Sequence, residues 1–248
     1  MAFEENQIIE LDVVDSTNNY AMKLIDGNKA HHGLTIVAKS QTDGKGQRGR
    51  VWIGKPDSSL LMTTIVSPGR LIEHQFVFNA AIAVAVADVL KTLDTDITVH
   101  IKWPNDIIVN DKKAGGILIE NILRGSNWYY SIIGLGLNVN HESFPEELPF
   151  ATSIKIEAQK DFDVTYIRDE IIGNILNFSK GYINELVIMN AYNGLLYKKG
   201  KKQIFTDGVE RIEVTIIQAK KDGTLEVQMQ DGEIASFRHG QITWEYGQ

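Results

Sequence analysis

Residues Gly44-Lys45-Gly46-Gln47-Arg48-Gly49 have the types and spacing suited to binding an anion. Three glycines let backbone N–H groups approach a phosphate or a carboxylate closely. Lys45, Arg48 and Arg50 add positive charge, and an arginine can donate two parallel hydrogen bonds to either group. Trp52 offers a flat apolar surface for stacking. A solvated basic hairpin is the alternative interpretation, and this segment alone leaves the two open.

The sequence that follows the glycines excludes three familiar enzyme classes. A dinucleotide-binding fold needs an apolar helix directly after the loop, but residues 51–57 contain Gly54 and Pro56 and lead into a strand. The V-A-I-K, H-R-D and D-F-G motifs of protein kinases are absent from the sequence. A Walker A loop needs Lys-Ser or Lys-Thr after its last glycine, whereas Arg50 and Val51 stand here.

A second group of candidate residues follows a predicted strand at Lys102-Trp103-Pro104-Asn105-Asp106. Asn105 and Asp106 supply an amide and a carboxylate, which suit a nucleotide or Mg²⁺. Lys113 precedes a glycine pair and an apolar strand, so its ammonium group can point into a cleft. The alternative for Lys112 and Lys113 is an ordinary hairpin tip.

Composition narrows the class of protein further. The chain has 248 residues, 43% hydrophobic and 23% charged, with a formal net charge of -7, so binding of nucleic acid by the whole chain is not expected. No cysteine is present, which excludes disulfides and cysteine zinc sites and favours a cytoplasmic location. The first ten residues lack the apolar core of a signal peptide, and no apolar run reaches the length of a membrane span.

The elements that must position these residues are predicted from hydrophobic periodicity. A helix begins after Ser16, and two more are expected at Phe76–Leu93 and Val164–Met189. Strands are predicted at Ile8–Val14, Leu34–Ala38, Ser59–Val66, Ile97–Trp103, Ile107–Val109, Gly116–Ile119 and Trp128–Val139. Beyond the basic linker Lys198–Lys202, the hairpin turns Asp222-Gly223 and Asp231-Gly232 indicate a small all-β module.

Five motifs, in this order, resemble those of the biotin–protein ligase (biotin–[acetyl-CoA-carboxylase] ligase) family. They are Asp15–Asn18, Gln41–Trp52, Lys102–Asp106, Lys113–Glu120 and the G-x-G-x-N at Gly134–Asn138. The likeness runs from about residue 8 to the end. It implies an α+β fold with a mixed, largely antiparallel central sheet and flanking helices, similar to class II synthetases. The expected domains are a catalytic domain, 1–196, and a small SH3-like β-barrel, 197–248.

The resemblance also implies a two-step reaction. Biotin and ATP give biotinyl-5′-AMP and pyrophosphate with Mg²⁺, and the biotinyl group then passes to a lysine of a biotin carboxyl carrier protein or domain. Some family members carry a DNA-binding winged helix before the catalytic domain. Since the first catalytic strand starts near Ile8, we expect a ligase without repressor function that binds neither DNA nor a membrane, as a monomer or a homodimer.

The resemblance also implies roles for the residues at matching motif positions. Catalytic roles are implied for Lys113, Arg48 and Lys45, and a role as magnesium ligand for Asp106. The residues implied to bind biotin are Ser16, Thr17, Asn18, Gln41, Lys45, Gly46, Gln47, Lys113 and Gly116. The residues implied to bind ATP or the adenylate are Lys45, Gln47, Arg48, Arg50, Trp52, Lys102, Asn105, Asp106, Lys113 and Asn138.

The glycine loop departs from the family pattern of Gly-Arg-Gly-Arg at Lys45 and Gln47. Lys45 keeps a charge without the guanidinium fork, and Gln47 loses the charge. We therefore expect weaker retention of the acyl-adenylate than in an arginine-bearing relative. Two alternative functions stay open: a lipoate- or octanoate–protein ligase-like transferase, and a non-catalytic sensor of biotin or nucleotide. Arg238 in the tail is either a nucleotide contact or a surface residue.

Overall fold

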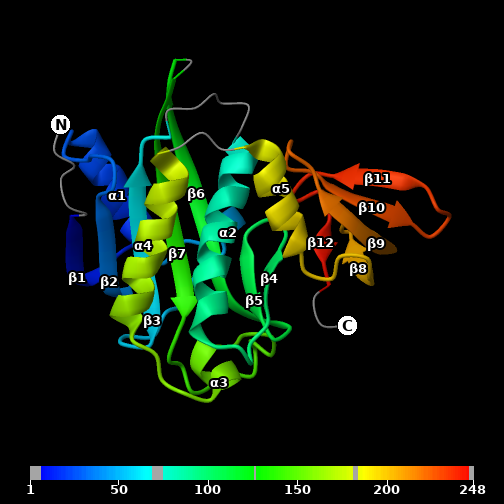
Figure 1. The fold of residues 1–248 in the computed structure, drawn as a ribbon, viewed down its shortest axis with the longest axis horizontal. Helices are drawn as coiled ribbons and strands as arrows, with labels where there is room; N and C mark the ends of the chain where they lie inside the picture. The colour runs from blue at the N-terminus through cyan, green and yellow to red at the C-terminus, as the bar shows by residue number, and fades with distance from the viewer. Residues whose placement is uncertain (1–6, 69–74, 126, 181–183, 246–248) are drawn as a thin grey trace.

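The computed structural model describes residues 7–68, 75–125, 127–180 and 184–245. Its larger sheet has seven strands in the order β1-β2-β3-β7-β6-β5-β4, in which β1 and β2 are parallel and the other neighbours antiparallel (Figure 1). The strands are β1 (Ile8–Val14), β2 (Thr35–Gln41), β3 (Ser59–Val66), β4 (Val99–Lys102), β5 (Asp106–Val109), β6 (Lys112–Arg124) and β7 (Asn127–Asn138). The predicted mixed sheet with flanking helices is confirmed.

Strand β7 shows how the sequence separates the two faces of this sheet. Successive side chains of a strand point to opposite faces. Ile133, Leu135 and Leu137 are buried in the main core, whereas Gly134 and Gly136 lie on the other face. The large residues fill one side, and the glycines leave room on the other for groups that approach the sheet closely.

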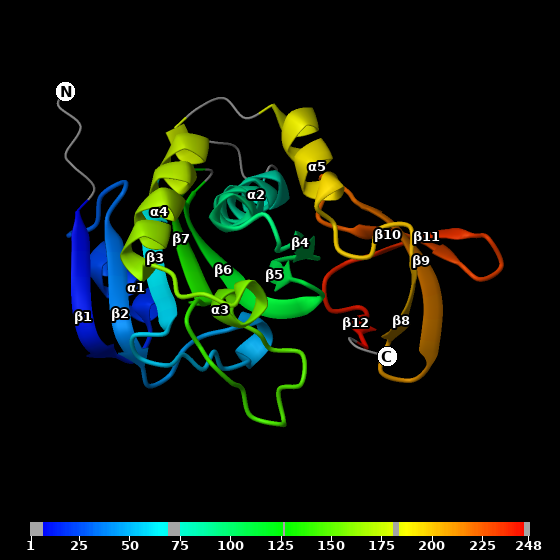
Figure 2. The same cartoon turned by 60° about the horizontal axis from the view of Figure 1, so that its bottom comes forward.

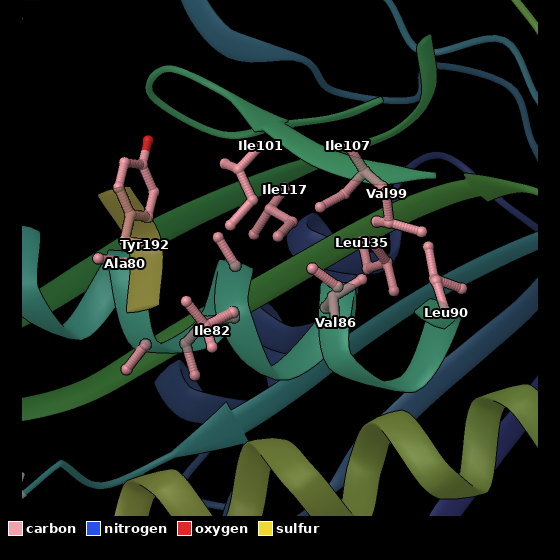
Figure 3. Packing of buried hydrophobic residues seen from close by; sticks show 14 of the residues in the cluster. Ala80, Ile82, Val86, Leu90, Val99, Ile101, Ile107, Ile117, Leu135 and Tyr192 are labelled. Carbon is pink, nitrogen blue, oxygen red and sulfur yellow. The ribbon is translucent and has the colours of Figure 1, made fainter. Parts of the chain in front are cut away.

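The helices are α1 (Thr17–Asp26), α2 (Gln75–Leu93), α3 (Ile154–Ala158), α4 (Val164–Lys180) and α5 (Glu185–Gly194). Figure 3 shows Ile82, Val86 and Leu90 of α2 against Ile117 and Leu135 of the sheet. By length and hydropathy alone α2 could span a membrane, but 67% of its most apolar stretch is buried inside the protein. It is the central core helix, packed also on α4 and α5.

Helix α1 packs on the opposite face of the sheet, against β2, β3 and β7. Its apolar residues Ala21 and Ile25 join a separate, smaller core with Ile36, Ile65 and Ile132. The start of α1 therefore lies on the same face as the glycines of β7.

A second sheet of five antiparallel strands has the order β11-β10-β9-β8-β12 and lies beside the β4–β5 edge of the large sheet (Figures 1 and 2). Its strands are β8 (Lys202–Thr206), β9 (Arg211–Ala219), β10 (Leu225–Met229), β11 (Ile234–Phe237) and β12 (Thr243–Trp244). Asn193 at the end of α5 exchanges hydrogen bonds with the backbone of Ala219, and the Trp103 Nε1–H donates to the Gly223 carbonyl at 3.1 Å. The predicted all-β C-terminal module is confirmed.

Several details differ from the sequence-based expectation. Strand β6 runs from Lys112 to Arg124 where Gly116–Ile119 was predicted, so Lys113 lies within the strand. The single helical stretch predicted at Val164–Met189 is two helices, α4 and α5, and the connection at 181–183 is outside the described residues. Strand β2 continues to Gln41, three residues beyond the predicted end, and so reaches the site directly. The domain boundary at 196/197 stays a prediction.

Candidate functional site

One end of the site is a closed network of uncharged polar side chains, which we name the polar end: Thr17, Asn18, Gln41 and Thr63. The Thr63 hydroxyl lies 2.7 Å from both Thr17 Oγ1 and Asn18 Oδ1. Gln41 Oε1 accepts from the Thr17 backbone N–H at 2.8 Å and from its hydroxyl at 3.2 Å. Thr17, Asn18 and Thr63 are at most 4% exposed, so these bonds hold the groups in one arrangement.

Glu120 of β6 connects this network to the glycine loop. The Asn18 Nδ2 donates to a Glu120 oxygen at 2.7 Å, which fixes the orientation of the amide, since Oδ1 accepts from Thr63. The other Glu120 oxygen lies 3.8 Å from the Lys45 ammonium. The charge of Lys45 is thus partly balanced within the protein.

Trp52 continues the site along β7, next to the polar end. A Cβ at Gly134 would lie 2.3 Å from Asn18 Oδ1, and a Cβ at Gly136 would lie 2.4 Å from the Trp52 indole. Only a glycine at each position admits such close neighbours. The Trp52 Nε1 is buried and has no hydrogen-bond partner among the described residues.

Lys113 lies beyond Trp52, in a charged cluster with Asp106 and Lys102. The Lys113 ammonium is 2.6 Å from one Asp106 oxygen and 5.8 Å from the centre of the Trp52 ring, and the Lys102 ammonium is 3.2 Å from the other Asp106 oxygen. Burial alone raises the pKa of Asp106, but Lys113 and Lys102 outweigh it and lower the pKa below its ordinary value. Two cations share one carboxylate, so the cluster carries a net positive charge.

The glycine loop is a small hairpin between β2 and β3. Lys45 and Val51 form a bridge, and the Gly46 N–H donates to the Arg50 carbonyl at 2.7 Å. Arg48 has a left-handed backbone, with φ 57°. No carboxylate of the described residues pairs with Arg48 or Arg50. We name Arg48, Arg50, Lys102 and Asp106 the basic end of the site, with three cations against one carboxylate. Lys113 lies between the basic end and Trp52.

One cavity of about 210 Å³ is lined by Thr17, Asn18 and Gln41 of the polar end, by Trp52 and by the charged residues of the basic end. Thr63 and Glu120 do not line it and act through their bonds to Asn18. The predicted site residues found on its walls are Ser16, Thr17, Asn18, Gln41, Lys45, Gly46, Gln47, Arg48, Arg50, Trp52, Lys102, Asn105, Asp106, Lys113 and Gly116. Asn138 does not line it. Its Nδ2 donates to the Thr152 carbonyl at 3.1 Å, and the Thr152 N–H in turn donates to the Lys113 carbonyl, so Asn138 supports the strand behind Lys113. Its buried Oδ1 has no partner among the described residues.

The residues around Asp106 do not fit the predicted magnesium site. Each of its oxygens is held by a lysine ammonium, whereas Mg²⁺ needs oxygen ligands around it. Within the described ranges, no three His, Cys, Asp or Glu residues gather in a way that could hold a metal ion.

Several residues of the site were not predicted from the sequence. Thr63 lies in the strand SLLMTTIV, where two threonines in an apolar run were the available signal. Glu120 was part of a motif but had no role. The C-terminal module adds a wall that includes His239, Gly240, Ile242, Thr243 and Trp244, whereas Arg238 is exposed and does not line the cavity.

The amino-acid sequence that forms this site matches a known protein family. Residues 10–138, more than half of the chain, match the sequence pattern of the biotin/lipoate A/B protein ligase family. The chain belongs to this family. The matched stretch contains every predicted site residue, from Ser16 in the loop before α1 to Asn138 at the end of β7.

Individual ligases of this family resemble the chain in sequence and in fold. It is 35% identical over 178 residues to the bifunctional ligase/repressor BirA of Bacillus spizizenii, a match that covers 71% of this chain and 53% of that protein. The chain thus spans about half the length of this curated relative. A biotin protein ligase from Aquifex aeolicus, in complex with biotin and ATP, has the same fold, with a TM-score of 0.80 at 24% identity over 99% of this chain and 100% of that chain. The Leishmania major biotin protein ligase in complex with biotinyl-5-AMP gives a TM-score of 0.63 at 27% identity over 94% and 99%.

Proposed function

We propose that the protein is a biotin–protein ligase, which activates biotin with ATP and transfers the biotinyl group to a lysine of a carrier domain. One observation carries the proposal: a single cavity joins an uncharged, preformed polar end to a basic end, with Trp52 and Lys113 between them. Biotin has an uncharged cyclic urea at one end and a carboxylate at the other, so it matches this polarity. The Leishmania protein, which binds biotinyl-5-AMP, supports the same assignment.

At the polar end, hydroxyl and amide groups recognise the urea ring of biotin. Ser16 is 1% exposed, lines the cavity and makes no capping bond to helix α1. Its hydroxyl is available to a ligand, while the bonds among Thr17, Asn18 and Thr63 keep the neighbouring groups oriented. Binding then requires little rearrangement, which favours affinity.

In the first step, an oxygen of the biotin carboxylate attacks the α-phosphorus of ATP, and pyrophosphate leaves. Both reactants are anions, so the protein must mainly supply positive charge at fixed positions. Lys113 provides it on the strand, held at 2.6 Å by Asp106. Arg48 and Arg50 provide it on the loop. Because Asp106 cannot balance both of its lysines, an anion at this end is favoured.

In the second step, the neutral amine of the acceptor lysine attacks the carbonyl carbon of biotinyl-5′-AMP. The amide bond forms, AMP leaves with the electron pair of the broken C–O bond, and the amine loses a proton. A biotin carboxyl carrier protein or domain is the proposed acceptor. Lys113 can stabilise the charge that moves onto the phosphate as AMP leaves.

Mg²⁺ is proposed to enter with ATP, held by the phosphate oxygens rather than by Asp106. The cytoplasmic location and a monomeric or homodimeric state stay predictions, which cell fractionation and sedimentation of the purified protein test. The expected lack of repressor function is also a prediction. Sequence-specific binding of a labelled promoter fragment in a gel-shift assay would contradict it.

The deciding experiment is pyrophosphate exchange into ATP with biotin, lipoate or octanoate added in turn. Exchange that depends on biotin is the expected result, followed by biotin transfer to a purified carrier domain. Exchange with lipoate or octanoate would instead identify a lipoate-type transferase. Exchange with none of the three, together with measurable biotin or ATP binding, would identify a sensor.

A further inference from the structure

The glycine loop contacts the turn between β11 and β12 of the C-terminal module, 191 residues away in the chain. The Arg48 guanidinium donates to the His239 carbonyl at 3.2 Å. The His239 ring in turn packs edge-on against Trp103, which directly follows β4, with ring centres 5.6 Å apart. The turn at 238–242 is therefore placed by the core of the molecule, and it holds the tip of a loop that has few partners of its own.

Gly240 provides the space for this contact. A Cβ at position 240 would lie 1.4 to 2.0 Å from three atoms of the Arg48 guanidinium, which is closer than any side chain can come. The guanidinium thus lies directly on the Cα of Gly240. The backbone there also has φ +91°, which by itself favours glycine. The close approach of the guanidinium requires glycine because of Arg48. The positive φ favours glycine because of the conformation of the turn.

We propose that Gly240 is a positioning residue for Arg48, through which the C-terminal module sets the geometry of the anion-binding loop at the basic end of the site. Arg48, His239 and Gly240 all line the cavity, so the contact is made at the wall where a ligand binds. Arg48 has no carboxylate partner among the described residues. The turn therefore supplies the constraint that an ion pair would otherwise supply, and leaves the charge available to a phosphate.

The proposal rests on the proposed function in one respect, that the anion bound here is ATP. A guanidinium held in place loses less freedom when it binds a phosphate than one that moves freely. Displacing it by an ångström or more is expected to weaken the reaction by about tenfold or more. Biotin recognition, at the other end of the cavity, is expected to stay unchanged.

Gly240→Ala tests the idea, with Gly232→Ala as a matched control. Gly232 lies in another turn of the same module, with φ +90°, but a Cβ there meets nothing within 4 Å. Both variants carry the same backbone strain, and only Gly240→Ala displaces Arg48. We expect an increase of about tenfold in the KM for ATP in biotin-dependent exchange for Gly240→Ala, no change for Gly232→Ala, and an unchanged Kd for biotin in both. In a variant that already carries Arg48→Ala, adding Gly240→Ala is expected to cause no further change in the KM for ATP.

Limited trypsin digestion provides a readout that does not depend on the reaction. Cleavage after Lys45, Arg48 and Arg50 is expected to be faster in Gly240→Ala than in the parent and in Gly232→Ala. If Gly240→Ala unfolds, Gly240→Asn, which tolerates the left-handed region better, takes its place in both assays. Equal behaviour of the two glycine variants, or additive effects in the double variant, overturns the proposal. If no exchange occurs in the parent, the proposed function fails, while the digestion still decides whether Gly240 holds Arg48.

Discussion

The polar end and the basic end of the cavity differ in how much of each is built before a ligand arrives. At the polar end, Thr17, Asn18 and Thr63 are buried and bonded to one another. At the basic end, Arg48 and Arg50 lie on a hairpin, where Arg48 is held among the described residues by the His239 carbonyl and by its contact with Gly240, both from a distant part of the chain.

The difference corresponds to what each end binds. An uncharged ring is recognised by hydrogen bonds whose directions must be fixed, so a rigid network serves it. A triphosphate is recognised mainly by charge, which acts over a longer range than a hydrogen bond, so fewer fixed contacts are needed before it binds. The following predictions test this difference between the two ends.

The largest effect is expected for Lys113, which lies where the two ends meet. Lys113→Met removes the ammonium that faces both Asp106 and Trp52. We expect the rate of biotin-dependent pyrophosphate exchange to fall by about 10²–10³-fold, the loss typical for one preorganised charge stabiliser. Lys112→Met is the control, because Lys112 is paired with Glu157 and does not line the cavity. An equal loss in both variants would contradict the assigned role.

Gly134→Ala breaks the polar end. Its Cβ would lie 2.3 Å from Asn18 Oδ1, so Asn18 must move and its bonds to Thr63 and Glu120 are lost. We expect the Kd for biotin, measured by calorimetry, to rise by about tenfold or more, as for the loss of one or two hydrogen bonds. In Gly173→Ala, on α4, the new Cβ meets nothing within 4 Å, and the helix is expected to gain up to about 1 kcal/mol. Unchanged biotin binding in Gly134→Ala would show that the polar end is not the biotin site.

Gln47→Arg strengthens the basic end. Gln47 lines the cavity, and arginine adds a charge with a fork that fits a phosphate. We expect slower release of the acyl-adenylate, by a few-fold, in a filter-binding assay. Gln47→Lys restores the charge without the fork. Its rate of acyl-adenylate release is expected to lie between those of the parent and of Gln47→Arg. If Gln47→Arg releases the intermediate as fast as the parent, the departure of this loop from the family pattern has no such consequence.

Much of the fold was predictable because its signals are local. Strand β3 matches its predicted bounds, since a run of apolar and β-branched residues ends at polar residues on both sides. The break between α4 and α5 was not predictable, because both helices carry apolar residues at helical spacing. Which helix covers which face of the sheet depends on long-range packing, such as Ala21 and Ile25 against Ile36.

The site was predictable to the extent that its residues lie within motifs. The loop residues, Asn105, Asp106 and Lys113 all line the cavity as expected. The C-terminal contribution was missed because the contact from Arg48 to His239 joins segments that no local pattern relates. The magnesium role of Asp106 was suggested by its residue type and by its position in a family motif. The structure shows that Lys102 and Lys113 occupy its oxygens.

The smallest expected effect concerns His141, which does not line the cavity. Its ring lies 2.7 Å from Ser59, the first residue of the strand that carries Thr63, and stacks on Phe144 with ring centres 4.9 Å apart. Ser59 also accepts from the backbone of Lys55, in the segment that leaves the loop. Burial, and then Lys55, lower the pKa of His141 below its ordinary 6.5.

The unfolded chain therefore binds a proton at His141 at higher pH than the folded protein does. The stability that comes from a neutral, buried His141 is fully present above about pH 6.5 and is lost as the pH falls from there through the lowered pKa. His141→Gln removes this titration and leaves the other histidines in place. We subtract the Tm of His141→Gln from the Tm of the parent. This difference is expected to be smaller at pH 5.5 than at pH 7.5. Parallel Tm curves would mean that His141 takes up its proton as easily in the folded protein as in the unfolded chain.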